Sequence, residues 1–157
     1  MTVAGTKPVI TTSRAIWRGE HRFEAGPEGR TVTVDADAKV APGPVETLLN
    51  AIVTCSGVDV IDILGKRRTP PSRSEARIRA ERRKEAPRRV ERLEIEFHID
   101  GEGIEPEHAE RAIELALEKY CSVSASLAPD IVSESRLVLN GQHYPPTQRA
   151  MWKCGRD

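Results

Sequence analysis

Residues 44–65 decide the fold that the sequence predicts; they read Pro-Val-Glu-Thr-Leu-Leu-Asn-Ala-Ile-Val-Thr-Cys-Ser-Gly-Val-Asp-Val-Ile-Asp-Ile-Leu-Gly. We expect one long helix here, because Pro44 suits a first helical turn and Glu46 complements the positive end of the helix dipole. Apolar side chains cover most of its circumference, which predicts a helix surrounded by protein. Cys55 lies near its middle. A thiol at such a place is often an inert core residue, so its reactivity is the central question.

Length and composition predict a single domain over residues 1–157, large enough for one core. Lys and Arg together number 24, as do Asp and Glu, so no net charge draws the chain to nucleic acid or to a membrane. The first fifteen residues lack the apolar core of a signal peptide, and the uncharged run 47–58 is too short to span a bilayer. We therefore expect a cytoplasmic protein. Three cysteines in that compartment do not predict a disulfide framework.

Strands are expected on both sides of the long helix. Before it lie a loose lead-in at residues 1–13, strands at 14–18, 21–25 and 31–34, and a loop at 35–43. After it come strands around 76–80 and 93–99, a helix at 106–120, a short helical turn at 122–127, a strand at 131–139 and a tail at 141–157. This order predicts the α+β class, with a mostly antiparallel sheet.

A second cysteine, Cys121, follows the end of the second predicted helix. If its sulfur meets that of Cys55, a sulfenic acid formed on one cysteine can condense with the other to a disulfide. The spacing in the sequence does not show that they meet. On spacing and burial alone, two inert core thiols are the commoner case.

Two cysteine motifs resemble those of the OsmC/Ohr family. Residues 44–64, around Cys55, resemble its first motif, and residues 118–127, Glu-Lys-Tyr-Cys-Ser-Val-Ser-Ala-Ser-Leu, resemble its second. Residues 97–101, Phe-His-Ile-Asp-Gly, also follow the family pattern, and the match covers roughly residues 14–140. The form Cys-x-x-x-Asp-Val is more similar to the YhfA-like branch than to typical OsmC or Ohr proteins.

The resemblance implies an OsmC-like fold: an intertwined homodimer with the long helices buried at its centre and active sites at the subunit interface. It implies a thiol peroxidase without a cofactor that reduces organic hydroperoxides to alcohols. Cys55 corresponds to the peroxidatic cysteine and Cys121 to the resolving one, and an external dithiol reduces their disulfide. The alternative is a non-catalytic member that binds a hydrophobic small molecule in the same interface.

The family also uses an arginine from the N-terminal hairpin to hold the thiolate. By its position after Trp17-Arg-Gly19 we choose Arg22, with Arg18 and Arg30 as reserves. A solvated surface charge is the other interpretation of each of them.

The supporting carboxylate departs from the family pattern. Active Ohr-type members carry a glutamate ten positions before the first cysteine, where this chain has Val45, and Glu46 falls on the opposite helix face from Cys55. Glu46 therefore suits the helix dipole better than the site. Asp59 shares the face of Cys55. Paired with the arginine it would replace the glutamate, whereas an unpaired carboxylate there would disfavour the thiolate.

Three other features of the sequence do not indicate a functional site. The basic stretch 66–92 has no aromatic residue on which a base could stack, so we expect a solvated face and no nucleic-acid partner. The four histidines have no metal-ligand spacing, and we expect no metal. Cys154, in the C-terminal tail, has no assigned counterpart.

Overall fold

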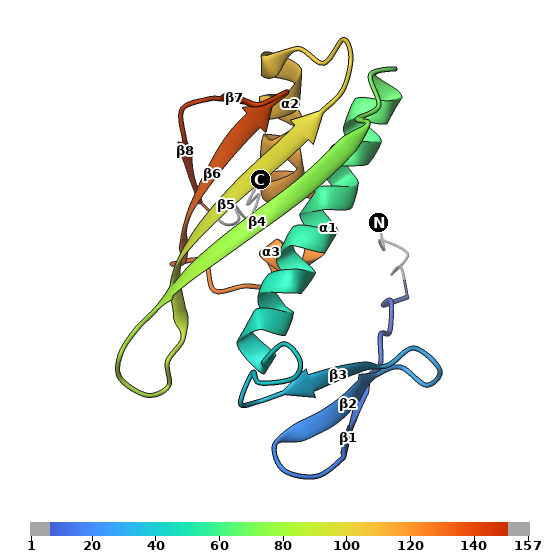
Figure 1. Ribbon diagram of the computed structural model, residues 1–157, viewed down its shortest axis with the longest axis vertical. Coiled ribbons are helices and arrows are strands. Elements are labelled where there is room, and N and C mark those ends of the chain that lie inside the picture. Colours follow the sequence, from blue (N-terminus) through green and yellow to red (C-terminus); the bar gives the residue numbers. More distant parts are fainter. Residues whose placement is uncertain (1–6, 151–157) are drawn as a thin grey trace, which may run out of the picture. The chain divides into compact units, whose positions relative to one another are not determined.

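The computed structural model describes residues 7–150 (Figure 1). The chain divides into two compact units, of which the first ends at Thr47 and the second begins at Leu48, and each is described by itself. The single domain expected from the length therefore stays a prediction. Cys154 lies outside the described residues.

The first unit is a three-stranded antiparallel sheet. Its strands are β1 (Arg14–Trp17), β2 (Arg22–Gly26) and β3 (Val32–Asp35), in that order. The predicted strands are confirmed to within a residue or two at each end. Trp17, Phe23 and Val34 lie opposite one another in the register and form one apolar face. Trp17 is 65% exposed, so this face is largely uncovered within the chain.

The long helix α1 (Pro44–Lys66) begins with a defined cap. The Gly43 N–H donates to Glu46 Oε2 at 2.8 Å, so a glutamate in the first turn satisfies a backbone donor that the helix leaves free. At the other end Arg68 has a positive φ of 65°, and the Thr69 N–H donates to the Leu64 carbonyl at 3.1 Å. The bounds predicted from the sequence are therefore confirmed.

Only one face of α1 is buried within the chain. Ile52, Ser56, Val60 and Leu64 recur every four residues and are buried. Val58, on another face, is 52% exposed. The prediction of a helix surrounded by protein on nearly all sides is therefore not met by a single copy of the chain.

By length and composition, α1 also has the character of a membrane-spanning helix. Its 23 residues include a window of 18 with mean hydropathy 1.6, a longer apolar segment than residues 47–58 alone. The core helix of a soluble protein has the same character. The regular burial of Ile52, Ser56, Val60 and Leu64 is the pattern of a helix that packs on a core through one face.

The second unit is built on a five-stranded sheet. Its strands are β4 (Arg73–Arg82), β5 (Val90–Asp100), β6 (Val132–Leu139), β7 (Gln142–His143) and β8 (Thr147–Ala150). The order is β4-β5-β6-β7, with β8 also paired to β6. Only β5 and β6 are parallel. The mostly antiparallel α+β fold is thus confirmed.

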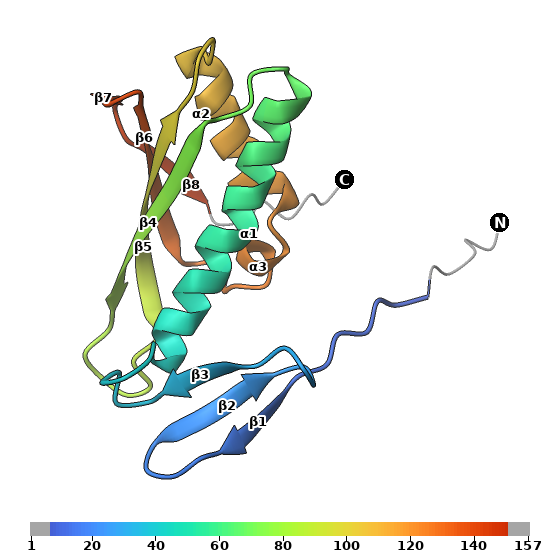
Figure 2. The same ribbon diagram turned by 45° about the vertical axis from the view of Figure 1, so that its right-hand side comes forward.

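The parallel pair needs a crossover, and the segment that carries Cys121 supplies it. It consists of α2 (Pro106–Leu115), the π-helical turn η1 (Ala116–Tyr120) and the short α3 (Ser122–Ala125). Figure 2 shows α1 and α2 on the same face of the sheet. The sequence predicts one helix over 106–120, and the structure corrects its last turn from α to π.

Alternation along β5 separates the two faces of this sheet. Leu93, Ile95, Phe97 and Ile99 are buried beneath the helices. Glu94, Glu96 and His98 point the other way, where Arg77, Arg79, Arg92 and Arg136 form ion pairs with glutamates. The basic stretch thus meets acidic partners on the wet face, as expected of a solvated surface.

Phe97 is fully buried at the centre of this core. Replacing it with alanine is expected to lower the free energy of unfolding by about 3–5 kcal/mol, because the change removes apolar contact and leaves a cavity. Urea denaturation measures the loss. The control is Arg77→Ala on the wet face, which should cost no more than about 1 kcal/mol. A loss at Phe97 as small as that of the control would contradict this core assignment.

The C-terminal segment differs from the expectation. Residues 141–157 are predicted from the sequence as a tail, but β7 and β8 both lie within them. β8 pairs with β6 from Val132↔Ala150 to Ser135↔Thr147. Its sequence, Thr-Gln-Arg-Ala, has no apolar alternation, so backbone pairing rather than burial of a hydrophobic face forms this strand.

Candidate active site

Cys55 and Cys121 are brought together in the second unit. Cys55 lies on α1 and is half-buried, whereas Cys121 follows η1 and is fully buried. The two side chains are near enough for Cys55 to raise the pKa of Cys121, and both are free thiols. Two residues 66 positions apart therefore meet because α1 and the crossover segment cover the same face of the sheet (Figure 2).

Local backbone geometry fixes the Cys121 sulfur. The π-helical turn ends as the Cys121 N–H donates to the Ala116 carbonyl at 2.8 Å. Cys121 then caps α3, and its Sγ accepts hydrogen bonds from the Ser124 N–H at 3.4 Å and from the Ser124 hydroxyl at 3.2 Å. Ser124 is itself fully buried. π-Helical turns are frequent at functional sites, where the extra residue redirects a side chain.

The surroundings of Cys121 favour its protonated form. Burial is the largest cause that raises the pKa of the thiol, and the neighbouring Cys55 raises it further. The two hydrogen bonds from Ser124 lower the pKa, because they stabilise the thiolate, but they do not outweigh burial. Cys121 is therefore a sheltered thiol, in keeping with attack on an adjacent oxidised sulfur rather than on a ligand from solvent.

An arginine from β8 anchors the turn that leads into Cys121. Arg149 Nη1 donates to Glu118 Oε1 at 3.1 Å, and Arg149 Nε donates to Ser135 Oγ on β6 at 2.9 Å. The Arg149 side chain is only 9% exposed and that of Glu118 23%. The ion pair thus joins the last described strand to η1, three residues before the buried cysteine.

Replacing Arg149 with methionine is expected to lower the free energy of unfolding by about 1–3 kcal/mol, because Glu118 keeps a poorly solvated charge without its partner. Urea denaturation of the single variants and of the Arg149→Met/Glu118→Gln double variant measures the coupling. Arg149→Lys, which keeps the charge but loses the second donor, is expected to lose less. Additive effects of the two single changes would show that the pair does not contribute.

Asp59 lies one helical turn beyond Cys55 on α1. Its Oδ2 atom is buried and has no hydrogen-bond partner within residues 7–150. Burial is the largest cause that raises its pKa, the nearby Asp62 adds to the effect, and Lys66 opposes it. The hypothesis that Asp59 pairs with an arginine therefore finds no such pair in the described chain.

A groove of about 370 Å³ runs between α1 and the crossover helix. Asp59 and Ile63 line it from α1, and Leu115 and Tyr120 line it from the opposite side. Arg67 and His108 also line it, and Arg67 Nη2 lies 2.6 Å from His108 Nε2. The lining residues nearest in sequence to the two cysteines are Asp59, one turn after Cys55, and Tyr120, directly before Cys121; neither cysteine lines the groove itself.

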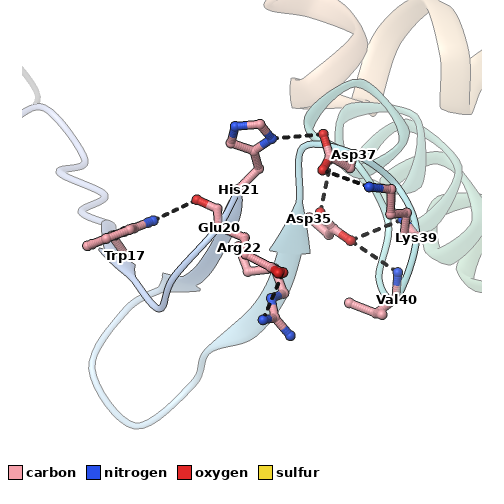
Figure 3. A network of polar contacts seen from close by, with 8 residues as sticks. All are labelled: Trp17, Glu20, His21, Arg22, Asp35, Asp37, Lys39 and Val40. Carbon is pink, nitrogen blue, oxygen red and sulfur yellow. Dashed lines mark hydrogen bonds and ion pairs between the residues drawn. The ribbon is translucent and has the colours of Figure 1, made fainter.

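In the first unit, Arg22 begins strand β2 and has an incomplete set of partners. Its Nη2 lies 3.0 Å from Glu20 Oε2, a largely exposed carboxylate, while its Nε is buried without a partner in the described residues (Figure 3). The reserve Arg18 instead makes two hydrogen bonds to Glu24, at 2.7 and 3.0 Å. Of these two arginines, Arg22 has the more available guanidinium; Arg30 is exposed.

A polar network beside Arg22 orders the loop before α1 (Figure 3). Asp35 accepts backbone N–H donors from Asp37, Lys39 and Val40 at 3.0–3.1 Å, and these bonds hold its pKa below the usual range. Asp37 Oδ1 lies 2.8 Å from His21 Nδ1. The loop therefore leads in a fixed conformation to Gly43, which caps the helix.

The hydrogen bond that the His21 ring donates to Asp37, followed by the charge of Asp37, raises the pKa of His21 above 6.5. The stabilisation from this pair is fully present at low pH down to where Asp37 itself protonates, and it is lost as the pH rises through the raised pKa. An NMR titration of His21 in the Asp37→Asn variant is expected to give a lower pKa than in the wild type. The variant Asp62→Asn, remote in sequence and in the second unit, is the control and should leave the titration unchanged. Equal values for His21 in the wild type and Asp37→Asn would contradict the pairing.

Glu46 is occupied at the start of α1. Its Oε2 accepts the Gly43 N–H, the contact that caps the helix. This structural role agrees with the preference derived from the sequence, in which Glu46 complements the helix dipole. No contact of Glu46 in the described residues supports a catalytic role for it.

Sequence reasoning missed Arg149, Glu118 and Ser124. Ser124 could have been predicted, because the residue three positions after a helix-capping residue is placed to donate a hydrogen bond to the capping side chain. Arg149 had none, since the strand that carries it has no hydrophobic pattern. Within residues 7–150 no group of three His, Cys, Asp or Glu side chains forms a candidate metal site.

Comparison with known proteins agrees with the two cysteine motifs and the fold. Protein YhfA of Escherichia coli K12 is 36% identical over 100 residues, which span 63% of this chain and 75% of YhfA. A hypothetical protein of Aquifex aeolicus VF5 has a crystal structure with a TM-score of 0.77 at 28% identity, covering 85% of this chain and 98% of its own. The likeness to YhfA confirms the branch expected from the sequence.

A more distant structure shares the fold alone. The organic hydroperoxide resistance protein OhrB of Bacillus subtilis has a TM-score of 0.54 at 13% identity, covering 83% of this chain and 98% of its own. The family model described as OsmC-like protein matches residues 35–135, which contain both Cys55 and Cys121. The chain therefore belongs to the OsmC-like family.

Proposed function

We propose that the protein is a thiol peroxidase that reduces organic hydroperoxides through Cys55 and Cys121. The Cys55 sulfur attacks the terminal oxygen of the hydroperoxide, the O–O bond breaks, and an alcohol and a Cys55 sulfenic acid are formed. The Cys121 sulfur then attacks the sulfenic sulfur, which releases water and forms the disulfide. An external dithiol reduces that disulfide and is itself oxidised.

The observation that carries the proposal is the nearness of the two thiols within one chain. Cys55 is the more exposed of the pair, as a sulfur that meets the substrate should be. Cys121 is buried against it and held by Ser124, as a resolving thiol should be. Membership of a family that includes hydroperoxide resistance proteins supports the same assignment.

The supporting residues are also part of the proposal. We assign the cation that favours the Cys55 thiolate to Arg22, because its guanidinium retains an enclosed donor without a partner in the described chain. We assign Glu46 to the helix cap and keep Asp59 as the carboxylate nearest to Cys55 in the sequence of α1. The protein is proposed to act in the cytoplasm, where thiols are kept reduced.

A homodimer is the proposed working form. Proteins of the OsmC/Ohr family are commonly dimers. Here Val58 and Ile61, on the uncovered face of α1, are 52% and 42% exposed, and Trp17 and Val32 are exposed on the apolar face of the first sheet. Exposed apolar faces of this kind mark protein–protein contacts. A second copy of the chain would cover both faces and complete the burial predicted for the long helix.

Stopped-flow mixing of the reduced protein with tert-butyl or cumene hydroperoxide tests the activity. The expected result is the consumption of one equivalent of hydroperoxide with the loss of two thiols per chain, since each turnover oxidises the pair once. Cys154 is changed to serine beforehand, so that only Cys55 and Cys121 are counted. No consumption above the rate of free cysteine would refute the peroxidase. It would leave the non-catalytic alternative, which the partly apolar groove favours and which ligand-induced shifts in thermal stability would reveal.

A further inference from the structure

The position of Asp59 relative to Cys55 follows from the helix itself. Residues four apart on an α-helix lie on the same face, with Cβ atoms about 5–6 Å apart. Cys55 and Asp59 have this spacing in the middle of α1. Their side chains therefore share one face of α1, at a separation that a bound hydroxyl group can bridge.

The environment of the Asp59 carboxylate also differs from that of an ordinary surface acid. Its Oδ2 is enclosed and has no hydrogen-bond partner in residues 7–150, although Asp59 lines the groove between α1 and the crossover helix. A buried polar atom without a partner is unusual and requires an explanation. An O–H group of a bound ligand would satisfy it, and a hydroperoxide carries such a group at the oxygen that Cys55 attacks.

The groups around Asp59 leave it free to accept and release a proton. The charged and titratable side chains that share its groove are Asp62 and Lys66 on α1, Arg67 in the turn after it, His108 and Arg111 on α2, and Tyr120 on η1. Arg67 is in contact with His108 and Arg111 pairs with Glu114, so neither is committed to Asp59. Burial and Asp62 raise the Asp59 pKa, which makes the carboxylate a stronger base than a solvated aspartate.

We propose that Asp59 is the proton carrier of the peroxidase reaction. The Asp59 carboxylate takes the proton of the Cys55 thiol as the sulfur bonds to the terminal peroxide oxygen. It then gives that proton to the alkoxide that leaves as the O–O bond breaks. The reactants are a thiol and a hydroperoxide, the products are a sulfenic acid and an alcohol, and Asp59 ends in its initial state.

This role rests on the proposed peroxidase, and it gives the acid near Cys55 a function in the reaction. General base removal of the proton during the attack gives the Cys55 sulfur thiolate character as it bonds to oxygen, which adds to the effect of the proposed cation. Protonation of the leaving alkoxide then lowers the barrier to O–O cleavage, and such transfers contribute about 100- to 10,000-fold in rate.

The test compares two electrophiles in the Asp59→Asn variant, which has nearly the same shape as the wild type. Hydroperoxide needs a proton on its leaving group, whereas iodoacetamide releases iodide and needs none. We expect the rate with tert-butyl hydroperoxide to fall by at least about 100-fold. Alkylation of Cys55 by iodoacetamide, in a background with Cys121→Ser and Cys154→Ser, should fall by a clearly smaller factor, because it uses Asp59 as a base but not as an acid. Asp130→Asn, a change of an exposed aspartate outside the groove, is the matched control and should leave both rates unchanged.

The outcomes separate this inference from the proposed function. A wild-type protein that does not consume hydroperoxide refutes the peroxidase itself. A wild type that does so while Asp59→Asn retains its hydroperoxide rate, or loses both rates in parallel, overturns the proton carrier and leaves the peroxidase standing. In the wild type, the hydroperoxide rate should also fall as acid protonates Asp59, at a pH above that expected for an unperturbed aspartate, and Asp59→Asn should lack this decrease.

Discussion

Replacement of Cys55 by serine is expected to abolish hydroperoxide consumption, with a rate loss of at least about 1,000-fold. The serine hydroxyl has nearly the same size and preserves the packing of α1, but it is a far weaker nucleophile than a thiol and does not form a sulfenic acid. Stopped-flow measurement with cumene hydroperoxide, at equal concentrations of variant and wild-type protein, gives the ratio. A variant that retained a tenth of the wild-type rate would show that another group meets the substrate.

The matched variant is Cys121→Ser, which separates the two steps of the reaction. It should consume one equivalent of hydroperoxide and stop, because the Cys55 sulfenic acid has no partner thiol with which to condense. Dimedone labelling followed by mass spectrometry should find the adduct on Cys55. If Cys121→Ser were as inactive as Cys55→Ser, the roles given to the two thiols would have to be revised.

Replacement of Val58 by aspartate is expected to weaken dimerisation by at least about 100-fold. Val58 lies on the uncovered face of α1, and a carboxylate there would be buried without a partner when a second copy of the chain covers that face. Sedimentation velocity over a range of protein concentrations measures the change. The control, Ala128→Asp, adds the same charge in an exposed loop and should leave the association unchanged.

The same experiment tests the dimer itself. A wild-type chain that sediments as a monomer at all concentrations would contradict the proposed working form. A wild-type dimer that Val58→Asp leaves intact would place the interface away from this face of α1. Either result would leave the contact between Cys55 and Cys121 unaffected, since both thiols belong to one chain.

Much of the fold could be predicted because the hydrophobic pattern and the caps are local signals. The alternation of Leu93, Ile95, Phe97 and Ile99 specified β5, and Pro44 with its following glutamate specified the start of α1. The strands of the C-terminal segment were missed because they form by backbone pairing to β6, and such pairing leaves no trace in the residues themselves. The π-helical turn was missed for a similar reason: one additional residue in a helical turn does not disturb an apolar stripe enough to be seen.

The site was predicted less completely than the fold. The spacing and neighbours of the two cysteines picked out the reactive pair, but only the tertiary fold brings Cys55 to Cys121. A missing partner, such as that of Asp59 Oδ2, is a property of the folded environment and has no counterpart in a linear sequence. The long-range ion pair of Arg149 with Glu118 is equally invisible, because Glu118 lies in the second cysteine motif but nothing in the sequence links it to Arg149.

Because β8 anchors η1, the support of the turn before Cys121 forms late during synthesis. Synthesis proceeds from the N-terminus, so both reactive thiols leave the ribosome before Arg149, the residue that secures the turn preceding Cys121. A nascent chain in which residue 149 is still within the exit tunnel therefore has its cysteines without this support. We expect full redox competence to be acquired only after residue 149 has left the exit tunnel.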